Sequence, residues 1–204
     1  MNDVRWCVVM NNLLYPAVLG TLIYTGFNEF SGHAIWGEQA FLALALFVLY
    51  VMDYAHSVSE GNRKAYTSGR FLADLVIVAC LFIAGNAILG ENLFPAVHPA
   101  WWLLGTKLAA LWWECWGHLR EKWPPRKRVE VETDTAFALV YLIVAVGSLN
   151  MEIPALVLAA VVAADAFYYY QYESLVAAAS KAASAPKAPA KPRVRRVRAK
   201  TVPA

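Results

Sequence analysis

The chain has little charge and few cysteines. Only 16% of its 204 residues are charged, whereas soluble domains average about 25%. Three cysteines are spread through apolar runs without a Cys-x-x-Cys spacing, which argues against a disulfide framework or a zinc knuckle. The sequence also has no glycine-rich phosphate loop and no Gly-x-Ser-x-Gly turn. It therefore predicts no catalytic residue, and Cys115, which follows Glu114 on a tryptophan-rich segment, is interpreted as a packing residue.

Long apolar runs make up most of the chain. Hydrophobic residues account for 59% of it, and a helix needs about 20 mostly apolar residues to cross a bilayer. The runs that meet this requirement are 6–27, 35–56, 71–90, 99–118, 135–149 and 153–175. They do not alternate between polar and apolar residues, as the strands of a transmembrane barrel would. The sequence predicts an all-α membrane protein in which residues 1–176 form six transmembrane helices, and short connections favour three antiparallel hairpins.

Basic residues are missing from every second connection between these runs. All but one of the 18 Lys and Arg residues lie before the first run, after the second, after the fourth or beyond the sixth. In the remaining connections and at their borders, the charged residues are all acids, namely Glu29, Glu38, Glu91 and Glu152. Because Lys and Arg near helix ends stay on the cytoplasmic side, we expect both termini in the cytoplasm and the protein in the cell inner (plasma) membrane.

Ionisable residues inside the runs are the candidate binding groups, because a charge within a bilayer is costly and is usually kept for a function. They are Asp53 and His56 in the second run, Glu114 and His118 in the fourth, and Asp165 in the sixth. Helical spacing puts each acid on one face with a His or Tyr neighbour. We expect the three faces to form an acidic, aromatic-lined cavity that opens toward the cytoplasm.

Lys107 is the only basic residue within a run. Counted from the outer helix ends at 1.5 Å per residue, Lys107 lies roughly 12 Å deep and Asp165 roughly 17 Å deep. Since an unpaired ammonium is costly at such a depth, we predict a structural ion pair between Lys107 and Asp165. Glu114, two turns along the helix of Lys107, is the alternative partner.

Two further acids have local explanations. Asp134 precedes the fifth run, where it is interpreted as the N-cap of the helix. Asp74 lies one turn into the third run, where the helix dipole favours an acid and Arg70 is four residues away. Both residues are therefore assigned structural roles.

Three functions fit this pattern. The leading one is binding or transport of a proton, a small cation or a metal ion by the intramembrane acids. The alternative is a non-catalytic membrane scaffold or accessory subunit, as a homo-oligomer or within a larger complex. The third is a b-type haem electron carrier, in which His56 and His118 ligate the iron from opposite sides. His33 and His98 would then form a second pair near the outer face. The cofactor stays open between haem b and a divalent metal.

The C-terminal segment differs from the rest of the chain. Residues 177–204 are mostly Ala, Pro, Lys and Arg, a composition that cannot bury a core and predicts a disordered cytoplasmic tail. Its basic cluster contains Arg193, Arg195, Arg196 and Arg198. These residues are the candidates for binding an anionic lipid or an acidic partner.

Overall fold

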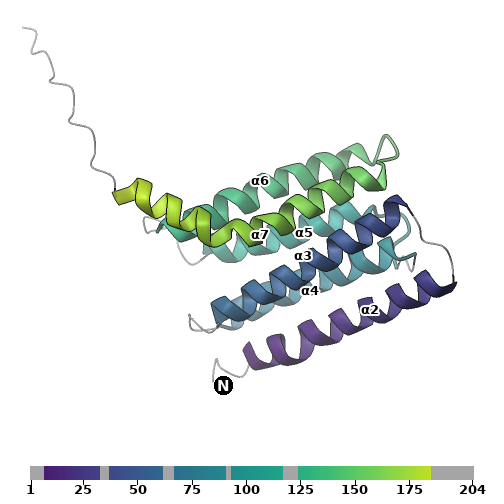
Figure 1. Cartoon of the computed structure of the whole chain (residues 1–204), viewed down its shortest axis with the longest axis horizontal. Coiled ribbons are helices and arrows are strands. Elements are labelled where there is room, and N and C mark those ends of the chain that lie inside the picture. Colours follow the sequence, from purple (N-terminus) through teal and green to yellow (C-terminus); the bar gives the residue numbers. More distant parts are fainter. Residues whose placement is uncertain (1–6, 33–36, 62–66, 91–92, 117–123, 185–204) are drawn as a thin grey trace, which may run out of the picture.

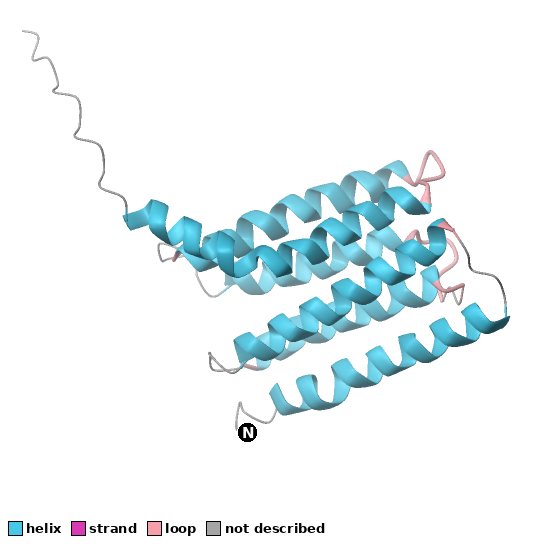
Figure 2. Cartoon of the chain, in the orientation of Figure 1, coloured by secondary structure: helices cyan, strands magenta, loops and turns pink. Residues whose placement is uncertain are grey.

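The structure is a computed structural model that describes residues 7–32, 37–61, 67–90, 93–116 and 124–184. Every regular element in these ranges is a helix, as Figure 2 shows. The first is a π-helical turn, and it continues directly into the first long helix. In chain order the elements are η1 (Met10–Leu14), α2 (Tyr15–Gly32), α3 (Glu38–Gly61), α4 (Ser68–Ile88), α5 (Pro99–Trp116), α6 (Pro125–Gly147) and α7 (Ala155–Ser184). The expected all-helical class is confirmed.

Four helical segments are long and apolar enough to cross a membrane. They are Cys7–Glu29, Glu38–Val58, Ser68–Ile88 and Ala155–Tyr172. The helix α5 contains Lys107 and Glu114, and the first three turns of α6 are strongly charged. The described helices therefore indicate a membrane protein with four candidate spans. That α5 and α6 also cross the membrane is a proposal.

The helices lie side by side along one direction, as Figure 1 shows. The most extensive contacts join α3 to α7 and α4 to α5, followed by α5 with α6 and α6 with α7. The helix α2 makes few contacts with α3 and packs mainly against α4. There the missing side chain of Gly85 leaves room for Leu22. A Cβ on Gly85 would lie 2.5 Å from Leu22 Cδ2. Most of the extensive contacts thus join consecutive helices, and the contact of α3 with α7 brings together helices that are distant in sequence. The first expected hairpin, α2 with α3, is the least packed part of the bundle.

Two boundaries differ from the sequence prediction. The helix α6 begins at Pro125, ten residues before the expected fifth run, with an extended Pro124 as its N-cap. Proline is favoured in the first helical turn because its fixed φ suits the helix and its missing N–H would be unpaired there. The helix α7 continues to Ser184, beyond the predicted start of the tail at 177, because this stretch is rich in alanine. Residues 185–204, including the arginines of the basic cluster, lie outside the described residues.

The two ends of the bundle differ in charge. The first turn of α2 and the last turn of α7 lie at the same end (Figure 1), which we call the terminal end. Apart from the buried Lys107, the Lys and Arg residues of the described ranges lie in the half of the bundle nearer this end: Arg70, Arg126, Lys127, Arg128 and Lys181. The other end, which we call the opposite end, carries Glu29, Glu38 and Glu152.

Candidate functional site

A lysine held between two aspartates lies at the centre of the bundle. Lys107 of α5 places its Nζ 2.6 Å from Asp165 Oδ1 of α7 and 3.2 Å from Asp134 Oδ1 of α6. Lys107 is 4% exposed and Asp165 is fully buried. The structure thus brings together the two residues that depth alone had paired, and it adds a third. We call Lys107, Asp134 and Asp165 the lysine triad.

Aromatic side chains enclose the lysine triad. The second oxygen of Asp165 accepts a hydrogen bond from Tyr141 Oη of α6 at 3.0 Å. Lys107 Nζ lies 5.4 Å from the ring centroids of both Phe137 and Tyr169, within the range of cation–π attraction. These contacts take the place of water around the ammonium of α5, and its charge is compensated by groups from two helices, α6 and α7.

Asp134 is the clearest correction to the sequence prediction. It is not an N-cap, because α6 begins nine residues earlier, and it is buried at 8% exposure. Lys127, Glu130, Asp134 and Tyr141 follow one another at helical spacing on the same face of α6. The paired prolines at 124 and 125 were the sequence signal that could have shown this.

Asp53 forms a second polar centre on α3. Its two carboxylate oxygens accept hydrogen bonds from Tyr15 Oη of α2 at 2.8 Å and from Tyr169 Oη of α7 at 3.1 Å. Tyr15 is positioned in turn by Tyr50, whose hydroxyl donates to the Tyr15 backbone carbonyl at 2.9 Å. Sequence reasoning identified Asp53 and missed Tyr15, which it treated only as part of an apolar run.

Two cavities are lined by residues of the lysine triad and by Asp53. A cavity of about 20 Å³ lies between the two centres, lined by Asp53, Lys107, Asp165, Tyr169, Thr106 and apolar residues. A second cavity, of about 60 Å³, lies toward the terminal end and also reaches Asp53. We call it the vestibule. Its polar lining comprises Tyr15, Asp53, His56, Ser57, Arg70, Asp74, Glu114, Glu130, Asp134, Tyr168 and Tyr169. The smaller cavity is large enough for one water molecule and the vestibule for a few.

Two acids of the vestibule, Glu114 and Glu130, have partners on another helix. Glu114 Oε2 of α5 lies 2.8 Å from Lys127 Nζ of α6. Glu114 therefore pairs with Lys127 and is not the alternative partner of Lys107 that the sequence suggested. Glu130 of α6 accepts a hydrogen bond from Tyr172 Oη of α7.

The expected pairing of Asp74 is present on α4. Arg70 Nε lies 3.5 Å from Asp74 Oδ1, one turn along the same helix. Thr67 caps this helix by accepting a hydrogen bond from the Arg70 backbone N–H at 3.3 Å. Arg70 and Asp74 both line the vestibule, so the ion pair that stabilises the start of α4 also contributes charge to the cavity.

Two of the four histidines, His56 and His98, lie in the described part of the chain. His56 packs against the rings of Tyr169 and Tyr172, with centroids 5.4 and 4.9 Å away. His98 accepts a hydrogen bond at Nδ1 from the Ala100 backbone N–H at 3.3 Å, at the start of α5. Burial lowers the pKa of His98, which favours this neutral acceptor form. His33 and His118 lie outside the described residues, so the haem hypothesis stays a prediction.

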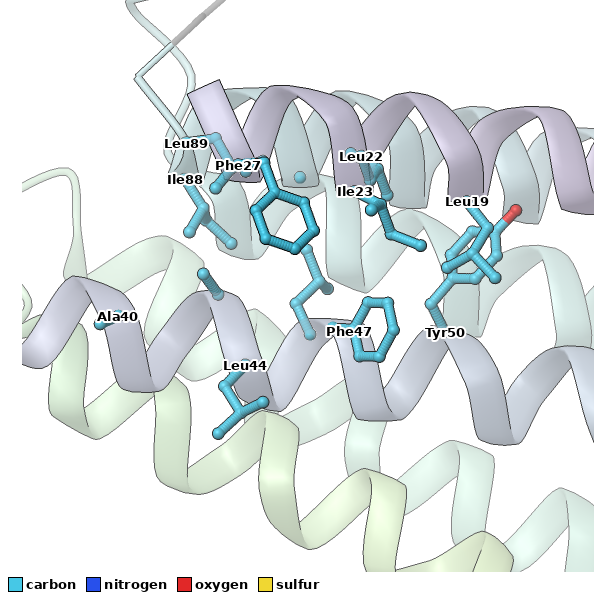
Figure 3. Close-up of a pocket in the computed structure, with 14 residues that line it drawn as sticks. Leu19, Leu22, Ile23, Phe27, Ala40, Leu44, Phe47, Tyr50, Ile88 and Leu89 are labelled. Carbon is cyan, nitrogen blue, oxygen red and sulfur yellow. The ribbon is translucent and has the colours of Figure 1, made fainter. Parts of the chain in front are cut away.

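A third hollow is apolar. It has a volume of about 570 Å³ and lies between α2, α3 and the end of α4 (Figure 3). Phe27 of α2 and Phe47 of α3 point into it from opposite sides. We call it the apolar groove, and it exists because α2 packs mainly on α4.

Comparisons with known proteins do not assign this site. No protein-family model matches the chain, and no curated protein or solved structure is detectably similar to it. Among the predicted candidates, the structure gathers Asp53, His56, Glu114 and Asp165 around the two cavities, which share Asp53 and Tyr169 in their linings. His118 lies outside the described residues. The chemistry of the site has to be inferred from these side chains.

Proposed function

We propose that this chain is a multi-pass protein of the inner membrane whose buried acids bind a small cation, and that this cation is the proton. The observation that carries the proposal is the arrangement of two polar centres around one small cavity. Asp53 lies on one side of it, and Lys107 with Asp165 lies on the other. A carboxylate in such a place has its charge balanced by fixed neighbours, so gain or loss of a proton changes the whole network.

The partners of the acids favour a proton over a metal ion. The oxygens of Asp53 and Asp165 face hydroxyl and ammonium donors at 2.6 to 3.1 Å. A metal ion needs several ligand atoms converging on one point, and it would compete with these donors. A proton needs only a chain of hydrogen-bonding groups with a water molecule to bridge the gap.

Substitution of Asp53 tests this function. In purified protein, infrared absorption of protonated carboxyl groups should change with pH, and Asp53→Asn should remove one such titration while keeping the side-chain shape. The control is Glu132→Gln on α6, because Glu132 is 60% exposed and its ion pair is with Arg128 one turn before it, at the surface of the bundle. An unchanged titration in Asp53→Asn, with the variant still folded by circular dichroism, would contradict the proposal.

A non-catalytic accessory subunit is the second candidate, and the apolar groove favours it. The groove is lined almost entirely by apolar side chains, and Phe27 in it is 72% exposed. A transmembrane segment of another protein would bury such residues without unpaired polar groups. In this function the lysine triad would serve only to hold α5, α6 and α7 in place, and Asp53 would show no separate titration.

The proposed topology has six spans with the terminal end in the cytoplasm. It is supported by the Lys and Arg residues near that end and by the acids at the opposite end. Reporter fusions at Ser59 and Ala204 should read cytoplasmic, and fusions at Asn92 and Asn150 should read external. A reversal at Asn92 would exclude the six-span arrangement, because α4, the helix between Ser59 and Asn92, would then not cross the membrane.

A further inference from the structure

The vestibule contains a buried hydroxyl that has no hydrogen-bond partner among the described residues. Ser57 of α3 is 4% exposed, it lines the vestibule, and its Oγ makes no hydrogen bond within the described part of the chain. A buried polar group without a partner is costly, and native structures usually satisfy it with a protein group or ordered water. Ser57 lies one turn from Asp53 toward the terminal end, so it marks the vestibule as a place for water.

We propose that the vestibule and the small cavity form a one-sided aqueous path that delivers protons from the terminal end to Asp53 and the lysine triad. The path ends there. This inference rests on the proposed function and adds the side of the membrane from which the proton arrives. In the loading step a hydronium ion in the vestibule gives its proton to the Asp53 carboxylate, which forms a carboxylic acid and leaves a water molecule.

Several charged and titratable groups face Asp53 across the two cavities. They are Tyr15 from α2, His56 from α3, Arg70 and Asp74 from α4, Lys107 and Glu114 from α5, Glu130 and Asp134 from α6, and Asp165, Tyr168 and Tyr169 from α7. The acids in this set outnumber the basic side chains Arg70 and Lys107, and they still do so when Lys127, the partner of Glu114, is included. A cavity with this excess of acid attracts cations and raises the local proton concentration.

Apolar packing closes the route toward the opposite end. One turn beyond Lys107 on α5 lies Leu103, and two turns beyond Asp165 on α7 lies Leu158. Ala145 of α6 lies at the same end of the triad, and all three residues are at most 1% exposed. Neither polar cavity includes any of them. Water and protons therefore reach the lysine triad from the terminal end only.

The accessibility of introduced cysteines tests this path. In a background in which Cys7, Cys80 and Cys115 are replaced by alanine, Ser57→Cys places a thiol in the vestibule. Thr106→Cys places one at the small cavity, and Ala145→Cys is the matched control in the apolar packing. The residues replaced are similarly buried, at 4%, 7% and 0% exposure. Silver ions, which are small and cationic, are added to membrane vesicles of either orientation, and protection from a maleimide mass tag is measured after denaturation.

The expected result depends on the side of addition. Silver added at the terminal end should protect Ser57→Cys about tenfold faster than silver added at the opposite end, and Thr106→Cys should follow more slowly. Ala145→Cys should stay unprotected from both sides. Equal rates from both sides for Ser57→Cys, or protection of Ala145→Cys at the same rate, would overturn the path.

This outcome can be separated from failure of the proposed function. Two-sided labelling with an intact Asp53 titration would refute only the one-sided path. One-sided labelling without any Asp53 titration would refute the proton function, and the proton path with it. If Ser57→Cys does not fold, the milder Thr106→Cys carries the same comparison of sides.

Discussion

Lys107→Asp should destabilise the protein in detergent by about 3–5 kcal/mol, the range for breaking a buried ion pair. The substitution removes the ammonium that lies 2.6 Å from Asp165 and 3.2 Å from Asp134. It leaves three acids facing one another where little water can enter. Unfolding in a graded series of denaturing detergent, followed by circular dichroism, measures the loss.

The charge swap separates a specific pair from a general need for positive charge. Adding Asp165→Lys to Lys107→Asp returns one ammonium between two carboxylates, and much of the lost stability should return. Arg128→Gln is the control, because Arg128 makes an ion pair of the same length, 2.6 Å, but is 69% exposed. Exposed pairs contribute little, so this change should leave unfolding unaltered. A double variant no better than the sum of its singles would show that the two residues do not act as a pair.

Lys127→Met should have the second largest effect, about 3 kcal/mol. Lys127 is the cross-helix partner of Glu114, at 2.8 Å, and both side chains are only 10% exposed. Without the ammonium, Glu114 stays in the vestibule as one more unbalanced acid among several. Melting of α6 away from α5 should therefore begin at the terminal end, and hydrogen exchange of the backbone amides near Glu130 measures it.

The double variant Glu114→Gln with Lys127→Met is the matched test of this pair. Because it removes both charges, it should be more stable than Lys127→Met alone. The neighbouring Arg128→Gln again controls for loss of positive charge at the start of α6. If the double variant is as unstable as Lys127→Met, the stabilisation comes from the lysine stem and not from the ion pair.

The sequence by itself determined the helical class and the charge asymmetry of the two ends. Apolar runs of about 20 residues form helices in a membrane because each backbone group must be paired within its own segment. It also determined that Lys107 needs an acidic partner, and helix rise alone identified Asp165. The depth of a residue in the membrane can be estimated by counting residues from the end of its helix. A charged group that lies far from water has few possible partners at the same depth.

Only the tertiary structure decided which acids share the centre. Asp134 joins Lys107 because α6 begins at Pro125, and Glu114 pairs with Lys127 because α5 and α6 lie against each other. Tyr169 reaches Asp53 from 116 residues further along the chain, and the most extensive contact joins α3 to α7. Rotation of one helix about its axis and the choice of its neighbours depend on side-chain packing among all the helices. Those contacts leave no periodic trace in the sequence of any single helix, so the lysine triad and its cavities exist only in the assembled bundle.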